Sequence, residues 1–248
     1  MTPDVVVDVG NTRIKRGRRI PDGAFVFDHF DPQWLNAEGL PGSSGATTWV
    51  VAGSHPERLA ELIRWARGES HNVVGVTSFK QLPIQVDVDY PESVGIDRLL
   101  GAVAANRLRT PGCVAITVDV GTAVTVNLID ADGTFTGGLI LPGVQLMTRS
   151  LHQNTAKLPL IESDGRRFAD HTFPGRSTED AILAGVSYAI AGAVRLALEH
   201  AKVGDEYPEL LLTGGGAAVV ADLLADYHPR QVPTLVLDGL LITAETLP

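Results

Sequence analysis

Short apolar runs rich in β-branched residues alternate along this chain with turn-forming residues and with segments of helical spacing. In the first half, such runs predict strands at residues 4–9, 13–19, 24–30, 47–52 and 73–76. Apolar residues at helical spacing predict helices over 56–67 and 93–108, the second with Ser93 as its N-cap. Pro, Gly and Ser crowd residues 41–46, where we expect a loop.

The second half repeats this order. Strands are expected at 114–120, 122–130 and 134–141, and helices over about 143–153 and 178–202. The polar stretch 159–176 predicts a loop, and "PELLLTGGGAAVVADLL" predicts a strand, a glycine turn and a helix, as does "TTWVVAGSHPERLAELI" in the first half. Two halves of this kind, residues 1–112 and 113–248, predict a duplicated α/β fold.

Composition narrows the picture mainly by exclusion. A net charge of −9 over 248 residues argues against a nucleic-acid partner, and no apolar run reaches the roughly 18 residues of a membrane span. A basic run from Arg13 to Arg19 is expected to form the solvated face of a strand hairpin. The lone Cys113, at the head of an apolar strand, is expected to be a buried structural thiol in a cytoplasmic protein.

The same tetrad of strand, aspartate, valine and glycine occurs twice, in "VVVDVGNTRIKRG" and in "ITVDVGTAVTVNL". A glycine directly after a strand lets the backbone turn sharply and expose N–H donors, which with the hydroxyls of Thr12 and Thr122 can bind phosphate oxygens. Asp8 and Asp119 are negatively charged, as phosphate is. We therefore expect a cation between each aspartate and the phosphate. The repeat therefore predicts two walls of a nucleotide site.

Two simpler interpretations of these glycines stay open. Asp-x-Gly after a strand is also a common structural turn, and Gly214-Gly215-Gly216 could be a plain helix-entry turn. Two copies in register, followed by a glycine triplet that admits close approach of a flat ring or sugar, favour the nucleotide interpretation.

"YPESVGIDRLLGA" places an acid and a base side by side near a helix start. Adjacent helical residues point to different faces, so Asp97 and Arg98 are not simply a mutual ion pair. Asp97 could accept a proton from a substrate hydroxyl, and Arg98 could hold a carboxylate. An aspartate placed there only for the helix dipole is the alternative.

The blocks "DVGNTRIKRG", "GIDR", "DVGTAVTVNLIDADGTFTGGLILPG", "SLHQNTAKLP", "STEDAILAG" and "LLLTGGGA" occur in this order. Together they resemble the type III pantothenate kinases, over residues 4–242. That resemblance implies the duplicated ribonuclease H-like fold of the actin-like ATPases, and ATP-dependent phosphorylation of pantothenate, the first step of coenzyme A synthesis. It also implies a homodimer whose pantothenate site is completed across the interface.

The resemblance also implies residue roles. Asp97 would be the general base, Asp119 the ligand of a monovalent cation (K⁺ or NH₄⁺), and Asp8 would lie near Mg²⁺ through water. The ATP-binding set would be Asp8, Val9, Gly10, Asn11, Thr12, Arg13, Ile14, Lys15, Thr122, Gly214 and Gly215. The pantothenate-binding set would be Tyr90, Gly95, Ile96, Asp97, Arg98 and Thr178, the last serving the neighbouring protomer.

Three departures from the family pattern stand out. Ser177 replaces a usual Asn, Asn127 stands where Asp is frequent, and "VVAGSHPE" at 50–57 differs from the usual sequence. Two rival functions stay open: another small-molecule kinase of the same fold, and a non-catalytic transcriptional accessory protein. The second would be favoured by loss of an aspartate among positions 8, 97 and 119, and all three are present.

Overall fold

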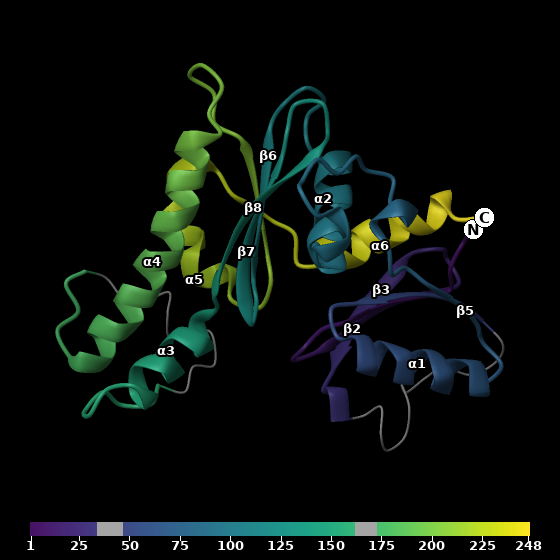
Figure 1. Ribbon diagram of the computed structural model, residues 1–248, viewed down its shortest axis with the longest axis horizontal. Coiled ribbons are helices and arrows are strands. Elements are labelled where there is room, and N and C mark those ends of the chain that lie inside the picture. The colour runs from purple at the N-terminus through teal and green to yellow at the C-terminus, as the bar shows by residue number, and fades with distance from the viewer. Residues whose placement is uncertain (34–46, 162–172) are drawn as a thin grey trace. The chain divides into compact units, whose positions relative to one another are not determined.

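The computed structural model describes residues 1–33, 47–161 and 173–248 (Figure 1). The loop expected at 41–46, and most of the one expected at 159–176, lie outside these residues. The chain forms two compact units, one of residues Met1–Leu108 with Thr234–Pro248 and the other of Arg109–Pro233. The last fifteen residues thus belong to the first unit, whereas the sequence halves join them to the second.

The first unit is built on a five-stranded sheet in the order β3-β2-β1-β4-β5. Its strands are β1 (Val5–Val9), β2 (Ile14–Arg19), β3 (Phe25–Phe30), β4 (Thr48–Gly53) and β5 (Asn72–Gly75). β1 to β3 form the predicted antiparallel meander, and β4 and β5 continue the sheet in parallel. Such parallel additions need a crossover, which the intervening helix supplies between β4 and β5.

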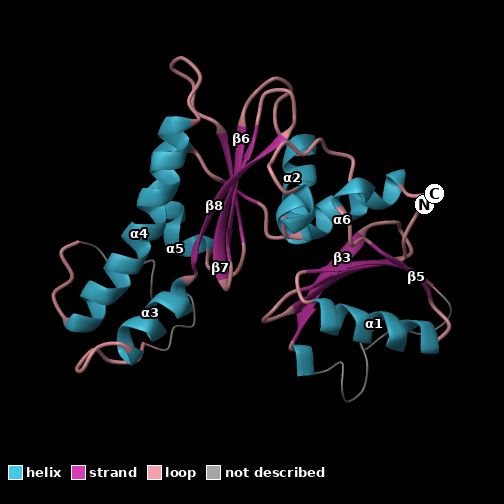
Figure 2. Ribbon diagram, viewed as in Figure 1, coloured by secondary structure: helices cyan, strands magenta, loops and turns pink. Residues whose placement is uncertain are grey.

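Helices cover both faces of this sheet (Figures 1 and 2). α1 (Pro56–Gly68) packs Leu59, Leu62 and Ala66 against one face, which includes the alternate valines of β1. α2 (Ile96–Leu108) and α6 (Leu235–Thr246) contact each other and the sheet on the other side. The buried central strand β1 therefore has no polar face, apart from Asp8 near its carboxyl end.

The second unit repeats the first strand for strand. Its sheet has the order β10-β9-β6-β7-β8. The strands are β6 (Ala115–Val120), β7 (Ala123–Ile129), β8 (Phe135–Pro142), β9 (Glu209–Thr213) and β10 (Arg230–Gln231). β6 to β8 form an antiparallel meander and β9 and β10 run parallel, so each half has the same topology. The duplicated α/β fold predicted from the sequence is confirmed.

One face of the second sheet carries the core of this unit. α4 (Thr178–His200) supplies much of that core, α3 (Val144–Gln153) and α5 (Ala217–Ala221) add to it, and Val118, Val120 and Leu212 meet them from the sheet. The opposite face is polar where β6, β7 and β9 lie side by side, because side chains alternate along a strand. Thr117, Asn127 and Thr213 are buried on that face.

Two local predictions were wrong, and one helix was not predicted. Ser93 lies in a short 3-10 helix (Pro91–Ser93), where its hydroxyl donates to the Tyr90 carbonyl, and α2 begins later, at Ile96. The C-terminal α6 was missed because its sequence, "LVLDGLLITAET", is apolar nearly all round and lacks an amphipathic period. Cys113 is half-buried rather than buried.

α4 is the one helix within the described residues that is long and apolar enough to cross a membrane by length and composition. The same test is passed by core helices of soluble proteins, and half of its most apolar window is buried. Ile190, Val194 and Leu198 are among its core residues. We therefore interpret α4 as a core helix.

The contact between α2 and α6 gives a stability test. A Cβ at Gly239 would lie 1.9 Å from the Leu100 carbonyl oxygen, so Gly239→Ala forces the two helices apart. We expect a loss of about 1–3 kcal/mol in the free energy of unfolding, measured by urea denaturation. Gly101→Ala in the same helix pair is the control: its Cβ would meet Leu235 at 3.8 Å, and we expect a small gain. Equal stability of the two variants would contradict the close packing.

Candidate active site

Each central strand ends in a tight turn that opens with glycine. After β1, Gly10 donates its N–H to the Arg13 carbonyl at 3.0 Å; after β6, Gly121 donates to the Ala123 carbonyl at 3.1 Å. A Cβ at Gly10 would lie 2.9 Å from the Arg13 oxygen, which explains the glycine there. In both turns the glycine N–H bonds to the carbonyl of the residue just before the partner of the preceding valine, although the first turn is one residue longer than the second.

Asp8 is nearly buried and lies beside a positive charge. It is 4% exposed, and the Lys15 Nζ lies 3.9 Å from its Oδ2 across the β1–β2 pair. The α1 residue Arg58 donates to the Asn11 carbonyl at 2.5 Å and ties the turn to the helix start. Sequence reasoning missed Arg58, which no local pattern marks.

The predicted ATP-binding set of the first unit divides by exposure. Asn11, Thr12 and Arg13 are exposed in the turn, where their backbone and side chains can meet a ligand. Val9 and Ile14 are fully buried in the core, so only their backbone groups could reach a nucleotide.

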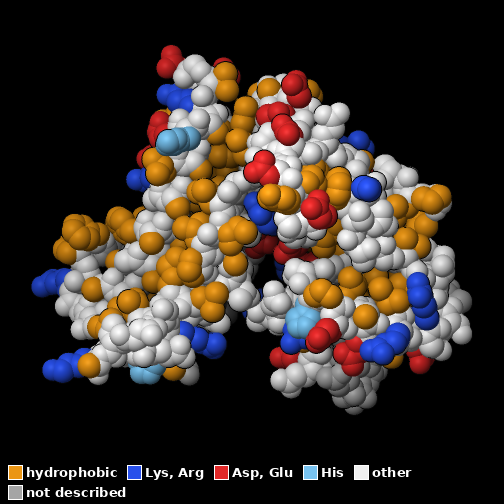
Figure 3. Space-filling view, in the orientation of Figure 1, with side chains coloured by type: hydrophobic (Ala, Val, Ile, Leu, Met, Phe, Trp, Pro, Cys, Tyr) orange, Lys and Arg blue, Asp and Glu red, His pale blue; other side chains and the backbone are white. Residues whose placement is uncertain are grey.

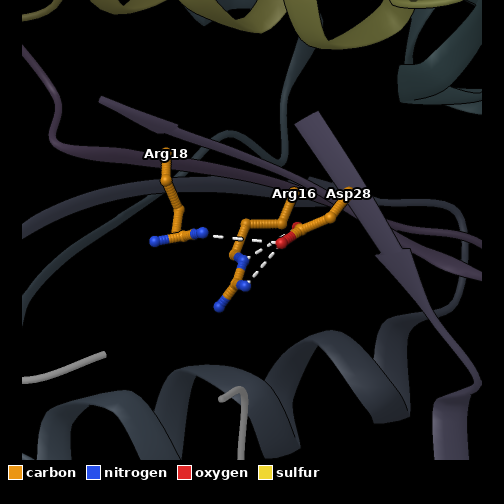
Figure 4. A network of polar contacts seen from close by, with 3 residues as sticks. All are labelled: Arg16, Arg18 and Asp28. Atoms are coloured by element: carbon orange, nitrogen blue, oxygen red, sulfur yellow. Dashed lines mark hydrogen bonds and ion pairs between the residues drawn. The ribbon is translucent and has the colours of Figure 1, made fainter. Parts of the chain in front are cut away.

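The hairpin behind this turn is held by a partly buried ion pair between Arg16 and Asp28 (Figure 4). Arg16 is 2% exposed, so the expected solvated face was wrong for this residue, whereas Arg13 is exposed and Lys15, Arg18 and Arg19 are partly exposed. Its Nε and Nη2 donate to the two carboxylate oxygens of Asp28 at 3.0 and 2.7 Å, and its guanidinium lies 4.6 Å from the Phe30 ring centroid. Arg18 approaches the same carboxylate at 3.8 Å. Because neighbours on a strand face opposite ways, Arg16 fixes β2 to β3 while Lys15 faces Asp8.

Asp119 lies against two glycine turns within the second unit. A Cβ at Gly214, whose φ is +90°, would come within 2.3 Å of Asp119 Oδ1 and 2.6 Å of the Val120 carbonyl oxygen. A Cβ at Gly121 would lie 3.5 Å from the same carboxylate oxygen. The structure therefore brings Asp119 and Gly214 together, and it places the exposed Thr122 and Gly215 in the same two turns.

The "GIDR" segment forms the start of α2. Gly95 accepts N–H bonds from Arg98 and Leu99 at 3.1 and 3.3 Å through its carbonyl, and the Arg98 N–H also donates to Asp97 Oδ1 at 2.9 Å. A Cβ at Gly95 would lie 2.6 Å from that same Oδ1, so glycine here leaves room for the carboxylate. Asp97 thus has a fixed side-chain orientation.

Arg98 combines partial burial with a neighbouring acid. Burial lowers the pKa of its guanidinium, and the Asp97 charge opposes that shift, yet an arginine stays protonated at neutral pH. Ile96 is buried, and Tyr90, just upstream, is 69% exposed. Of the predicted pantothenate set, Asp97, Arg98 and Tyr90 therefore present side chains that a ligand can reach.

Thr178, the remaining residue of the predicted pantothenate set, is the exposed first residue of α4.

Two of the three departures from the family pattern have simple structural roles. Ser177 caps α4, since its hydroxyl accepts the Asp180 N–H at 3.0 Å, as an asparagine would. Asn127 is buried in β7, where its amide donates to Thr117 and Thr125 at 3.1 and 3.4 Å. The third departure, residues 50–57, spans the end of β4, and there Gly53 packs tightly on Val9.

No group of three or more His, Cys, Asp or Glu side chains that could hold a metal ion occurs in the part of the chain that the structure describes. Near the two turns, the Asp8 carboxylate lies beside the Lys15 ammonium group, and the Asp119 carboxylate is paired across its sheet with Thr125 and Thr213, so the candidate metal donors are oxygens. Such donor sets suit hard cations bound loosely with water or phosphate, rather than a zinc-type centre.

Comparison with solved structures shows which fold the chain has. The chain resembles the ethanolamine utilization protein EutJ from Carboxydothermus hydrogenoformans, with a TM-score of 0.54, 16% identity, and coverage of 98% of this chain and 90% of that one. Component A of (R)-2-hydroxyglutaryl-CoA dehydratase from Acidaminococcus fermentans matches with a TM-score of 0.51 and 13% identity, over 98% and 96% of the two chains. At such identities the likeness concerns the fold alone. With the repeated sheet topology, it defines the duplicated ribonuclease H-like fold of actin-like ATPases.

Sequence relatives identify the family. The type III pantothenate kinase model matches residues 5–200. Type III pantothenate kinases from Paracidovorax citrulli and Thiobacillus denitrificans are 34% and 35% identical, covering 97% and 95% of this chain and 97% and 94% of theirs. The chain belongs to the type III pantothenate kinase family.

The contact between Gly214 and Asp119 gives a test of the second turn. Gly214→Ala must displace either the Asp119 carboxylate or the turn itself, and we expect binding of MgADP, measured by calorimetry, to weaken about tenfold or more. Gly112→Ala is the control, because Gly112 has nearly the same φ, +83°, with open space around it. Similar MgADP affinities for the two variants would place the nucleotide away from this turn.

Proposed function

We propose that this protein transfers a phosphoryl group from ATP to the primary hydroxyl of pantothenate, giving 4′-phosphopantothenate for coenzyme A synthesis. The observation that carries the proposal is full-length family membership with both Asp-Val-Gly turns and the "GIDR" segment intact. Phosphoryl transfer requires mainly positioning and neutralisation of charge, and the two turns and the α2 start offer groups for both.

Asp97 acts as general base in this proposal. One of its oxygens is occupied by the Arg98 N–H, which fixes the carboxylate, and the other can accept the proton of the attacking hydroxyl. The hydroxyl oxygen bonds to the terminal phosphorus as the bond to ADP breaks. Arg98 binds the pantothenate carboxylate by a charge-assisted pair of hydrogen bonds, and Tyr90 lines the same pocket.

The turn residues from Asp8 to Lys15, together with Thr122, bind the ATP phosphates through backbone N–H groups and hydroxyls. Gly214 and Gly215 admit the nucleoside side of ATP. Asp8 would hold Mg²⁺ through water. Asp119 would hold K⁺ or NH₄⁺, because the absence of a side chain at Gly214 leaves room beside its carboxylate oxygen. When bound, these cations supply positive charge against the phosphates.

A homodimer is part of the proposal. α3 and α4 enclose an open hollow of about 590 Å³ whose lining is almost wholly apolar and includes Leu146, Leu151 and Thr178. Exposed hydrophobic side chains gather over these two helices (Figure 3), among them Tyr188 of α4. Apolar patches of this kind mark interaction sites, and a second copy on this surface would put Thr178 near the partner's pantothenate.

The protein would act in the cytoplasm, where its substrates and a reduced Cys113 are expected, and without nucleic-acid or membrane partners.

The base assignment is tested by Asp97→Asn. The amide keeps the oxygen that accepts the Arg98 N–H but cannot take a proton, so we expect turnover to fall roughly 10²–10⁴-fold with an unchanged melting temperature. Turnover is measured by ADP release with MgATP and pantothenate, and Glu92→Gln, an exposed acid in the same segment, is the control. A near wild-type rate in Asp97→Asn would remove Asp97 from the role of base.

The dimer is tested at the hollow between α3 and α4. Leu146→Glu places a charge on the proposed interface, and we expect a monomer in analytical ultracentrifugation together with weakened use of pantothenate. Val203→Glu, another exposed apolar residue but outside the hollow, should stay dimeric. A dimeric Leu146→Glu variant would move the interface to another surface.

A further inference from the structure

The two Asp-Val-Gly repeats differ in what lies beside each aspartate. Across the first sheet, Asp8 is paired with Lys15 on β2 and with Ala52 on β4. Across the second, Asp119 is paired with Thr125 on β7 and with Thr213 on β9. The duplicated topology makes these positions equivalent, so an ammonium group and a methyl group in one half correspond to two hydroxyl-bearing side chains in the other.

The buried side chain of Thr213 has a hydroxyl group that lacks a hydrogen-bond partner in the part of the chain that the structure describes. The residue is 2% exposed, and its Oγ1 has no hydrogen-bond partner among residues 1–33, 47–161 and 173–248. A buried hydroxyl without a partner is costly, and native proteins rarely keep one without a reason. Ala52, the equivalent residue in the first half, is also buried, but its methyl group requires no hydrogen-bond partner.

Thr213 is the residue paired with Asp119 on the neighbouring strand. Residues paired across neighbouring strands point to the same face, about 5 Å apart, so Thr213 and Asp119 share the polar face of the second sheet. The next residue, Gly214, turns with a φ of +90°, and a Cβ there would come within 2.3 Å of Asp119 Oδ1. The Asp119 carboxylate and the Thr213 hydroxyl, which has no hydrogen-bond partner among the described residues, therefore lie at the same end of two neighbouring strands.

We propose that Thr213 is a further ligand of the monovalent cation, contributing its hydroxyl oxygen beside the Asp119 carboxylate. This inference rests on the cation site of the proposed function and deepens it. K⁺ is held by carbonyl, hydroxyl and carboxylate oxygens, and the site offers these types. In the first half Lys15 supplies the positive charge next to Asp8, and in the second an exchangeable cation takes that place between oxygens.

The test compares Thr213→Val and Thr213→Ser with the wild-type protein. Thermal melts are run with MgADP in KCl and in choline chloride at equal ionic strength, and K⁺ activation is measured by ADP release. We expect Thr213→Val to melt at the wild-type temperature or above in choline, since it removes an unsatisfied hydroxyl, and to lose the K⁺-specific rise in melting temperature. Its half-activating K⁺ concentration should rise about tenfold, and Thr213→Ser should restore both properties.

Thr117→Val is the matched control, because Thr117 is equally buried on the same face but its hydroxyl accepts the Asn127 amide. It should melt lower in both salts and keep the K⁺ response. The inference is overturned if Thr213→Val keeps the full K⁺ response while Asp119→Asn loses it, or if Thr213→Val changes only the affinity for nucleotide. A wild-type protein without any K⁺-specific rise would overturn the Asp119 site as well. The melts need no turnover, so failure of the proposed kinase activity would not imitate any of these results.

Discussion

Two carboxylates at the ends of two central strands set the constraint on which the remaining features depend. Asp8 and Asp119 each follow a buried β-branched run and precede a glycine, and each is flanked by closely packed strands. Glycines pack closely at both strand ends: a Cβ at Gly10 or Gly53 would meet the backbone of Arg13 or Val9, and a Cβ at Gly214 would meet the Asp119 carboxylate. A carboxylate repels a phosphate group, so an aspartate at a phosphate site requires a cation between the two, and phosphoryl transfer depends on such neutralisation of charge.

Duplication built the two strand ends, and divergence gave them different electrostatics. The first keeps a resident positive charge in Lys15 and anchors its hairpin through the Arg16–Asp28 pair. In the second, the residues paired with the aspartate on the two neighbouring strands are both threonines, Thr125 and Thr213. Under the proposed function, the first copy binds phosphate beside a fixed ammonium group and the second binds it through a bound cation. The chain as a whole carries a net charge of −9, so positive charge at the proposed phosphate site has to be local.

The sequence predicted the elements that have a clear period or a turn signal, and with them the duplicated topology. It could not predict properties that depend on which strands become neighbours. In the sequence, Thr213 is only the last residue of an apolar strand, and its pairing with Asp119 depends on the order of the strands in the sheet. An alignment of "VVAGS" with "LLLTGG" matches Thr213 to Ala52, which is paired with Asp8. Arg16 read as solvated because charge runs usually are, yet Asp28 lies opposite it on β3. The mostly apolar α6 shows no clear amphipathic period because most of its residues are buried in the first unit.

The most direct test of the central claim is a coupled ADP-release assay on the purified protein with MgATP, with and without pantothenate, in KCl and then in NaCl. The account predicts ADP release that requires pantothenate and is much faster in KCl. ADP release that is independent of pantothenate, or none in either salt from a folded protein, would contradict it and favour another substrate or a non-catalytic role.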